Sequence, residues 1–282
     1  MRHPLLSEAI GRLSTAGVAS PDVDAEILLA FVTCTARGSV RAGMPVSQEQ
    51  QEAYERLVAR RAAREPLQHL TESAPFRYLD LVVGPGVFIP RPETESLAGW
   101  AIDLIGTLDL PQPVVVDLCT GSGAIAASIA HEMPHAMVHA VELDDRAYAY
   151  AQRNLDGSRV DLRRGDIATA FTDLDGTVDI VVANPPYIPL AAYESVEQEA
   201  RDHDPSLALW SGEDGLDAIA VVETVACRLL RSYGQVGCEH ADVQDESAPG
   251  VFTSTGRWVD VRDRRDLAGR PRFVTATARR RR

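Results

Sequence analysis

The chain has 282 residues, of which 45% are hydrophobic and 24% charged, and its formal net charge is −13. This balance is typical of a folded globular protein, and the length predicts two domains because single cores rarely grow beyond about 250 residues. The acidic charge argues against broad binding to nucleic acid, which depends on Lys and Arg neutralising phosphates.

Cysteine usage and hydropathy exclude further classes. The four cysteines include no C-x-x-C pair, so neither a zinc site nor a disulfide framework is indicated, and no metal is predicted. No apolar run reaches the about 18 residues of a bilayer span, and the start lacks the apolar stretch of a signal peptide. We therefore expect a cytoplasmic protein.

Residues 1–65 are predicted to form a small helical bundle. Ser20 and Pro21 have the pattern of an N-cap followed by proline in the first turn, and the apolar face that follows holds Ile27, Leu28 and Phe31. Ser47 and Gln50 have capping-box spacing, and the apolar residues continuing at helical period are Tyr54, Leu57 and Val58.

Residues 66–92 are predicted to form a β-hairpin linker between the domains. The segment from Phe76 to Val83 is rich in β-forming residues, and Gly84, Pro85 and Gly86 after it indicate a turn.

Residues 93–282 alternate between strand and helix patterns. The strand-like segments are Val114–Asp117, Ala136–Glu142 and Val178–Ala183, and the helical ones are Gly123–Glu132 and Asp144–Leu155. Such alternation predicts an α/β domain with a parallel sheet covered on both faces and ligands at the carboxyl ends of its strands. We expect the pocket where Asp117, Glu142 and Asn184 converge.

A glycine-rich loop follows the first of these strands. Its residues, Cys119, Thr120, Gly121, Ser122 and Gly123, open a helix, and glycines there let backbone approach a ligand closely. The loop indicates a nucleotide-like cofactor, with Glu142 near the position of a ribose-binding acid. Alone, it does not separate a nicotinamide cofactor from S-adenosylmethionine. The alternative interpretation of the loop is a turn needed only for packing. The alternative interpretation of Glu142 is an exposed acid that caps a helix.

Two residues before the next strand are candidates for the adenine site. Asp166 can receive the adenine amino group, while Ile167 packs on the ring. A plain turn aspartate is the alternative for Asp166.

The sequence Asn184-Pro185-Pro186-Tyr187 ends the third strand at the expected ligand face. Proline donates no ladder hydrogen bond, so the two prolines end the pairing. The Asn184 side-chain oxygen and the Pro185 carbonyl can accept both hydrogens of a substrate NH₂ group, with Tyr187 stacked on its plane. Two such acceptors stabilise the positive charge that grows on a weakly nucleophilic nitrogen attacking a methyl sulfonium. The alternative is a rigid loop that terminates a strand.

The loop and this motif together are similar to those of amino-methyltransferases that use S-adenosylmethionine, including DNA and protein-glutamine enzymes. Further segments closely resemble the HemK/PrmC family of peptide chain release factor N5-glutamine methyltransferases. They are Arg64–Leu70, Gly86–Glu95, Asp117–Ile125, Asn184–Pro189 and Asp266–Val274, the last similar to the final strand of the family. The resemblance spans Glu8 to Ala278. This sequence departs from the family pattern at Glu72, Cys119 and Ala241, where the family often has glycine.

The resemblance implies a Rossmann-like methyltransferase domain that acts on the glutamine of the Gly-Gly-Gln loop in class 1 release factors. Cofactor contacts would come from Cys119 to Gly123, Glu142, Ile167 and Asn184, and substrate contacts from Asn184 to Tyr187. Phe88 and Arg91 would border the substrate, unless Arg91 only pairs with Glu93 or Glu95. We expect S-adenosyl-L-methionine as cofactor, the release factor as partner, no membrane or direct nucleic-acid partner, and a monomer.

Three rival functions stay open at this point. A DNA adenine or cytosine amino-methyltransferase would flip a base into the same pocket, but it predicts a basic face that the charge opposes. A non-catalytic protein that binds release factor and a nicotinamide-dependent dehydrogenase are the other two.

Overall fold

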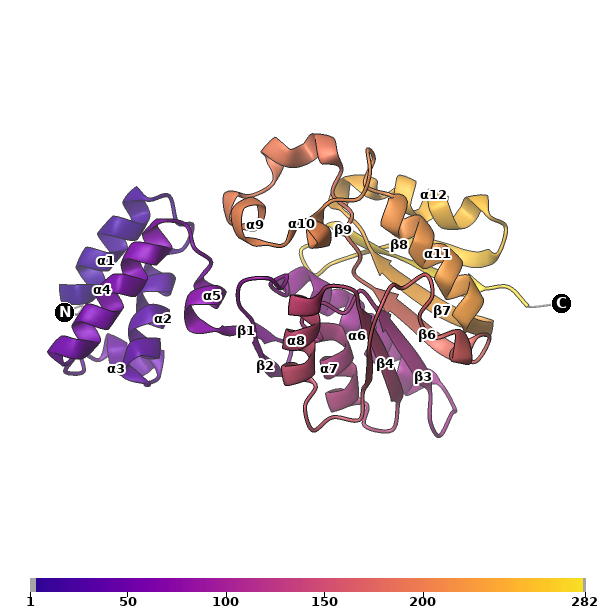
Figure 1. The fold of residues 1–282 in the computed structure, drawn as a ribbon, viewed down its shortest axis with the longest axis horizontal. Coiled ribbons are helices and arrows are strands. Elements are labelled where there is room, and N and C mark those ends of the chain that lie inside the picture. The colour runs from indigo at the N-terminus through magenta and orange to yellow at the C-terminus, as the bar shows by residue number, and fades with distance from the viewer. Residues whose placement is uncertain (1–3, 281–282) are drawn as a thin grey trace. The chain divides into compact units, whose positions relative to one another are not determined.

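The computed structural model describes residues 4–280 (Figure 1), so the first three and the last two residues of the predicted domains lie outside the described range. The chain divides into two compact units. The first unit runs to Ser73 and includes Glu197–His203, and the second comprises Ala74–Val196 and the residues from Asp204 onward.

The first unit is helical, and both predicted helix starts are confirmed. Its helices are α1 (Pro4–Thr15), α2 (Pro21–Thr33), α3 (Arg37–Arg41), α4 (Gln48–Ala62), α5 (Leu67–Thr71) and α9 (Gln198–His203). Pro21 lies in the first turn of α2. The Ser47 hydroxyl accepts the Gln50 backbone N–H at 3.2 Å, and the Gln50 side chain accepts the Ser47 N–H at 3.0 Å. These bonds satisfy donors that the start of α4 would otherwise leave unpaired.

The core of this unit holds most of the predicted apolar faces. Leu28, Tyr54 and Val58 are buried, whereas Phe31 is 44% exposed and was wrongly placed on the buried face. Helix α5 belongs to this unit although the sequence analysis put its residues in the linker. The predicted domain limits stay a prediction.

A β-hairpin formed by β1 (Ser73–Phe76) and β2 (Leu79–Val82) opens the second unit, apart from its first residue, Ser73, which belongs to the first unit. The hairpin is where it was predicted, but its turn is not. The chain reverses at Arg77, whose φ of 51° is in the left-handed region, so the expected continuous run from Phe76 is two strands. The turn predicted at Gly84 to Gly86 follows the hairpin, with the Val87 N–H donating to the Gly84 carbonyl at 3.3 Å.

A seven-stranded sheet forms the centre of the second unit, in the order β5-β4-β3-β6-β7-β9-β8. The strands are β3 (Val114–Leu118), β4 (Met137–Glu142), β5 (Asp161–Arg164), β6 (Val178–Ala183), β7 (Leu230–Glu239), β8 (Trp258–Arg265) and β9 (Pro271–Ala278). The three predicted strands are confirmed. The predicted parallel pairing is confirmed from β5 to β7. The sheet as a whole is mixed, because β9, whose direction was not predicted, runs antiparallel to β7 and β8. The predicted final strand begins only at Pro271, since Asp266 to Gly269 form the β8–β9 turn.

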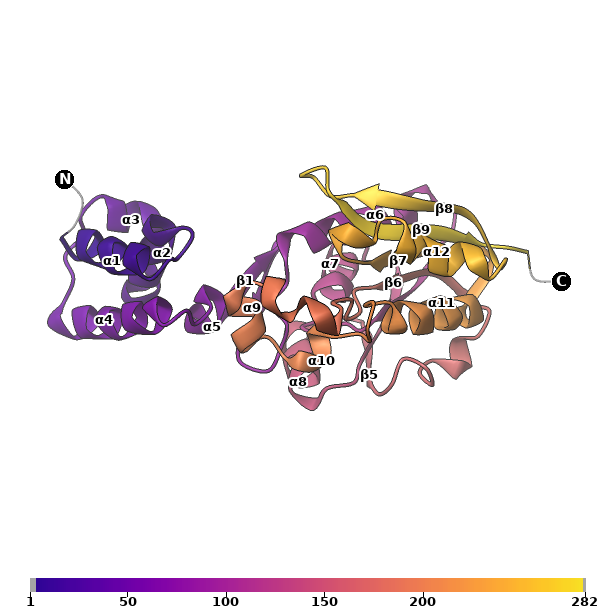
Figure 2. The same ribbon diagram turned by 90° about the horizontal axis from the view of Figure 1, so that it is seen from above.

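Helices cover both faces of this sheet (Figures 1 and 2). One face carries α6 (Glu95–Thr107), α7 (Ala124–Glu132) and α8 (Asp145–Asn154), and the other carries α11 (Asp217–Leu229) and α12 (Ser247–Ser254). The predicted helices α7 and α8 are confirmed. The remaining short elements are η1 (Pro92–Thr94), η2 (Thr172–Leu174), η3 (Leu190–Ser195), α10 (Ser206–Leu209) and η4 (Asp242–Gln244). Among the described residues, no helix has the length and apolar character that crossing a bilayer would need.

The register of the central strands aligns their carboxyl ends. Leu118 of β3 lies opposite Val141 of β4 on one side and Ala183 of β6 on the other. The residues that follow these strands therefore meet at one edge of the sheet, as is general for ligand sites in open α/β sheets.

Candidate active site

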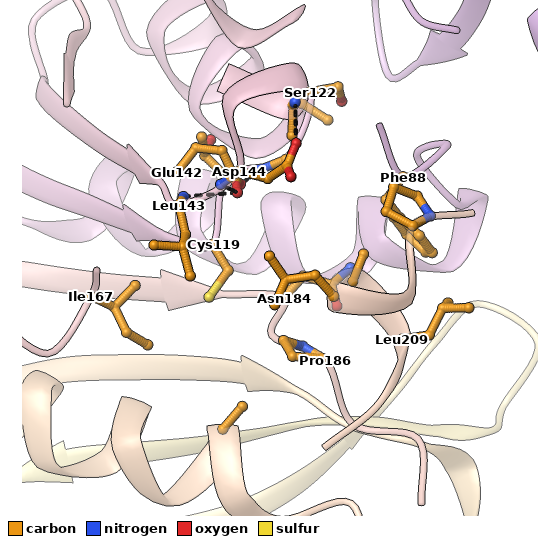
Figure 3. A pocket seen from close by; sticks show the side chains of 18 of the residues that line it. Phe88, Cys119, Ser122, Glu142, Leu143, Asp144, Ile167, Asn184, Pro186 and Leu209 are labelled. Atoms are coloured by element: carbon orange, nitrogen blue, oxygen red, sulfur yellow. Dashed lines mark hydrogen bonds between the residues drawn. The ribbon is translucent and has the colours of Figure 1, made fainter. Parts of the chain in front are cut away.

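A cavity of about 290 Å³ lies at this edge, within the second unit (Figure 3). It brings together most of the residues predicted from the sequence, and its walls are mostly apolar. The predicted residues that line it are Phe88, Cys119, Thr120, Gly121, Ser122, Glu142, Asp166, Ile167, Asn184, Pro186 and Tyr187.

Asp117, the residue next to the end of β3, fixes the glycine-rich loop through hydrogen bonds. This side chain is fully buried, and its Oδ2 accepts the Thr120 hydroxyl at 2.6 Å and the Ala126 N–H at 3.2 Å. Burial raises the pKa of Asp117 to about 7 because desolvation disfavours the charged form. Asp117 was expected in the pocket, but it lies beneath the loop and shapes it.

Backbone conformation explains the glycines of the loop. Gly121 and Gly123 have φ of 58° and 85°, which other residues adopt only with strain. A Cβ on Gly123 would lie 3.2 Å from Leu155 Cγ. Gly123 does not line the cavity. The absence of its side chain instead allows the start of α7 to pack closely against Leu155, at the end of α8.

Two departures from the family pattern occur at positions that favour glycine. Cys119 has φ of 60° and Glu72 has φ of 54°, both in the left-handed region, whereas Ala241 at φ of −67° is unstrained. The chain keeps the turn at Cys119 despite the cost of roughly 1 kcal/mol that a side chain adds there. The Cys119 side chain faces the cavity in Figure 3.

Glu142 lies in one wall of the cavity, where its carboxylate accepts three backbone N–H groups. One of its oxygens, Oε2, accepts the Gly121 N–H at 2.8 Å, and the other, Oε1, accepts the N–H groups of Leu143 and Asp144 at 2.8 and 2.9 Å. Burial raises its pKa, and these three donors oppose that shift. Glu142 is therefore not the exposed capping acid considered above; Asp144 caps α8 instead.

The wall beside Glu142 is apolar. Leu143 and Ile167 both line the cavity, and Asp166 lies at its rim, exposed, with its Oδ1 accepting the Ala168 N–H at 2.9 Å. Asp166 thus makes a turn, as its alternative supposed, and it borders the cavity, whereas its predicted contact with the adenine amino group stays a prediction. Leu143 was missed, although its position directly after Glu142 was a usable signal.

Asn184 and Pro186 line the cavity apart from Glu142 (Figure 3), and Tyr187 also lines it. Asn184 Nδ2 donates to the Thr94 hydroxyl at 3.3 Å. The Tyr187 hydroxyl donates to Glu239 Oε1 at 3.2 Å, and burial raises its pKa well above the ordinary value. Pro185 is buried and is not a lining residue. Its carbonyl accepts no hydrogen bond from the residues that the structure describes, so its predicted role as second acceptor stays a prediction.

Phe88 lines the cavity, whereas Arg91 does not. Arg91 pairs with the buried carboxylate of Asp204 at 2.6 Å and lies 5.1 Å from the centre of the Phe88 ring. The alternative, in which Arg91 pairs with Glu93 or Glu95, is therefore wrong, because its partner is Asp204. In this arrangement Arg91 supports Phe88 from outside the cavity.

Several lining residues were not predicted from the sequence. They are Gly86, Pro90, Thr94, Ala124, Ile125, Leu143, Asp144, Ala147, Ile188 and an apolar group from two later segments, Pro205, Leu207, Ala208, Leu209, Ala218 and Val221. Thr94 lies inside the family-like string from Phe88 to Glu95, so a signal existed for it. The later segments gave none, because short apolar stretches after residue 200 resemble ordinary core.

Comparisons with known proteins identify related families for two parts of the chain. Residues 4–71 match the family model described as the PrmC N-terminal domain, and residues 102–199 match the methyltransferase small domain. A Streptomyces coelicolor protein named release factor glutamine methyltransferase is 56% identical over 271 residues, covering 96% of each chain.

Two further comparisons bear on substrate and fold. A Streptomyces pristinaespiralis protein named 4-amino-L-phenylalanine/4-methylamino-L-phenylalanine methyltransferase is 39% identical, covering 90% of this chain and 87% of that protein. The crystal structure of a methyltransferase from Pyrococcus furiosus aligns with a TM-score of 0.51 over 72% of this chain and 90% of the other. At 19% identity, that likeness shows the fold alone.

Proposed function

Because this chain belongs to the family of release factor glutamine methyltransferases, we propose that it methylates the glutamine of the Gly-Gly-Gln loop in class 1 release factors. The methyl group passes from S-adenosylmethionine to the side-chain amide nitrogen, N5, of that glutamine. One observation supports this most strongly: Asn184, whose amide nitrogen is engaged by Thr94, borders the same cavity as Glu142 and the glycine-rich loop.

The residues present fit S-adenosylmethionine. Glu142 Oε2 accepts one N–H, and a carboxylate oxygen has two lone pairs, so one is left for a ribose hydroxyl. The apolar side chains of Leu143 and Ile167 suit the faces of adenine, and Asp166 at the rim suits its amino group. A Cβ built on Gly121 would meet no atom within 4 Å, so the space beside this residue is open. Because glycine has no side chain to fill that space, a ligand can approach the backbone there closely. The cofactor supplies a methyl group on a positively charged sulfur.

Orientation of the amide nitrogen is the task of the Asn184 motif. The lone pair of an amide nitrogen is delocalised, so it attacks slowly unless its hydrogens are held. Asn184 Oδ1 and the Pro185 carbonyl accept these two hydrogens and stabilise the positive charge that grows on nitrogen as the N–C bond forms and the S–C bond breaks. The sulfur leaves as a neutral thioether, and the methylated nitrogen then releases one of its two protons to solvent. Tyr187, held through its hydroxyl by Glu239, provides a flat wall beside the amide. No covalent intermediate with the protein is required.

Phe88 and the apolar group at Leu209 border the side of the cavity from which a glutamine side chain would enter (Figure 3). They exclude water around the amide, which strengthens the hydrogen bonds to Asn184. The protein acts as a monomer in the cytoplasm, where its partner is the release factor and neither membrane nor nucleic acid takes part.

A second candidate is methylation of a small aromatic amine, favoured by the 39% identity to the 4-amino-L-phenylalanine enzyme. Its amino nitrogen, like that of an amide, is delocalised and would suit the same acceptors. The higher identity and fuller coverage of the release factor enzyme favour the protein substrate.

Methyl transfer from a radiolabelled donor distinguishes these functions. Purified release factor, its Gln-to-Ala variant in the Gly-Gly-Gln loop, 4-amino-L-phenylalanine and duplex DNA are each offered to the protein. We expect label only in the intact release factor. Label in the amino acid or the DNA, or equal labelling of the variant, would contradict the proposal, and no transfer to any of them would favour a binding protein.

A further inference from the structure

A buried glutamine lies behind the Asn184 to Tyr187 motif. Gln244, the last residue of η4, is only 3% exposed and does not line the cavity. A primary amide in the interior is costly unless its polar groups are hydrogen-bonded, so the partners of this side chain indicate what it does.

Both ends of the Gln244 amide bind backbone. Its Oε1 accepts the Ala241 N–H at 2.9 Å, and its Nε2 donates to the carbonyls of Tyr187 and Asp214, each at 3.1 Å. A primary amide has two hydrogens to donate, which matches these two carbonyls. The opposite orientation of the amide would set its oxygen against both carbonyls, so the network determines the orientation. Gln244 therefore ties together three segments that are distant in sequence.

One of these segments is the end of the motif. Tyr187 lines the cavity and is held at two points, because Gln244 binds its carbonyl and its hydroxyl donates to Glu239 Oε1 at 3.2 Å. The next residue is fixed as well, since the Ile188 N–H donates to the Leu209 carbonyl at 2.9 Å. These contacts restrict rotation of the backbone after Tyr187 and of the ring itself.

The space around the Tyr187 carbonyl is tightly filled. A Cβ added to Gly215 would lie 2.2 Å from the Tyr187 carbonyl oxygen and 2.7 Å from Gln244 Nε2. No side chain fits at position 215 without displacing this hydrogen bond. The glycine and the glutamine thus serve the same contact, although they are far apart in the sequence.

Resting on the proposed function, we propose that Gln244 is a positioning residue. By holding the Tyr187 carbonyl, it fixes the end of the Asn184 to Tyr187 motif, so that the Tyr187 ring stays in the wall against which the substrate amide lies. The role is one of orientation, because Gln244 does not line the cavity and therefore contacts neither substrate nor cofactor. Small displacements of a group beside the reacting atoms are enough to slow a reaction strongly.

Kinetics of three variants test this role. Gln244→Glu keeps an acceptor for the Ala241 N–H but sets a carboxylate oxygen against the Tyr187 carbonyl, and Gln244→Met has a similar length without these hydrogen bonds. Each should lower kcat with release factor about 10- to 100-fold, while the Kd of S-adenosylhomocysteine should stay close to that of the wild type. Gln235→Glu is the matched control, because it makes the same substitution at a half-buried position of β7 outside the cavity lining. Its kcat should be unchanged.

A second readout does not depend on activity. The sequence has seven tyrosines, so labelling their rings with ¹³C gives a small set of signals, and that of Tyr187 is the one lost in Tyr187→Phe. In Gln244→Glu and Gln244→Met this signal should shift or broaden. The signal of Tyr54, in the core of the first unit, should stay, and Gln235→Glu should leave the Tyr187 signal in place.

A double-variant cycle separates positioning from general loss of stability. Tyr187→Phe removes the bond to Glu239, and Gln244→Met removes the bond to the carbonyl of the same residue. Because both bonds hold one residue, the combined kcat loss should differ from the product of the two single losses. Two substitutions that act independently on the fold would give that product.

The outcomes separate the two proposals. A wild-type protein that leaves release factor unmethylated refutes the proposed function, whereas the Tyr187 signal still tests whether Gln244 holds this residue. Wild-type kcat in either Gln244 variant, an unmoved Tyr187 signal, an equal kcat loss in Gln235→Glu, or losses that multiply in the cycle would overturn the role of Gln244. Should Gln244→Glu fail to fold, Gln244→Met carries the test, because methionine brings no charge into the interior.

Discussion

Truncating Asn184 to alanine separates its role in the reaction from its role in the fold. The side chain is half-buried and, among the residues that the structure describes, makes one hydrogen bond, to Thr94 at 3.3 Å. Losing a single hydrogen bond of this kind costs about 1 kcal/mol, which lowers the melting temperature of a unit this size by about 2–4 °C. The variant should therefore remain folded and bind S-adenosylhomocysteine with at most a modest loss of affinity.

The effect on turnover should be far larger. One preorganised group that stabilises charge in a transition state contributes about 10²- to 10³-fold to kcat, or roughly 2.7–4 kcal/mol. We therefore expect kcat with release factor to fall at least 100-fold, measured as transfer of a radiolabelled methyl group at saturating cofactor. Thr253→Ala serves as control, because it removes one hydrogen bond, to the Gly250 carbonyl, at an exposed position of helix α12. Methylation by Asn184→Ala at the wild-type rate would refute the reasoning.

Three further predictions concern the cofactor wall, the loop and stability. Glu142→Gln sets an NH₂ group against backbone donors, so the Kd of S-adenosylhomocysteine should rise at least about tenfold by calorimetry; an unchanged Kd would exclude Glu142 from the site. In Gly215→Ala, the added Cβ would lie 2.2 Å from the Tyr187 carbonyl oxygen at φ of 81°, so kcat should fall while cofactor affinity persists, and normal kcat would contradict this. The pKa of Asp117, raised from 3.8 to about 7, means that the folded protein holds a proton which the unfolded chain has released, so stability should fall as pH rises through that interval. Chemical denaturation at several pH values should show a weaker fall in Asp117→Asn, and an equal fall would contradict the assignment.

The sequence predicted the parts of this protein whose signals are local. Strands β3, β4 and β6 appeared as short aliphatic runs, and each carries its polar candidate immediately after or at its end, as with Glu142 and Asn184. Because parallel strands align their carboxyl ends, convergence of these residues followed from the strand pattern alone. The capping box at Ser47 was equally local, since both of its hydrogen bonds join residues three apart.

Contacts between distant segments were beyond such reasoning. Thr94 and Asn184 are 90 residues apart, and Arg91 and Asp204 are 113 apart; neither pair has a periodic pattern that would reveal it. The direction of β9 also depended on a turn, at Asp266 to Gly269, that looked like the start of a strand. Phe31 was placed in the core by helical period, although the tertiary packing of α2 leaves it exposed.

The most direct measurement is tandem mass spectrometry of the tryptic peptide that contains the Gly-Gly-Gln sequence, after release factor is incubated with this protein and S-adenosylmethionine. Our account predicts one added methyl group, located by fragmentation on the side chain of the glutamine and absent when Asn184→Ala replaces the wild type. An unmodified peptide, or a methyl group on any other residue, would contradict it.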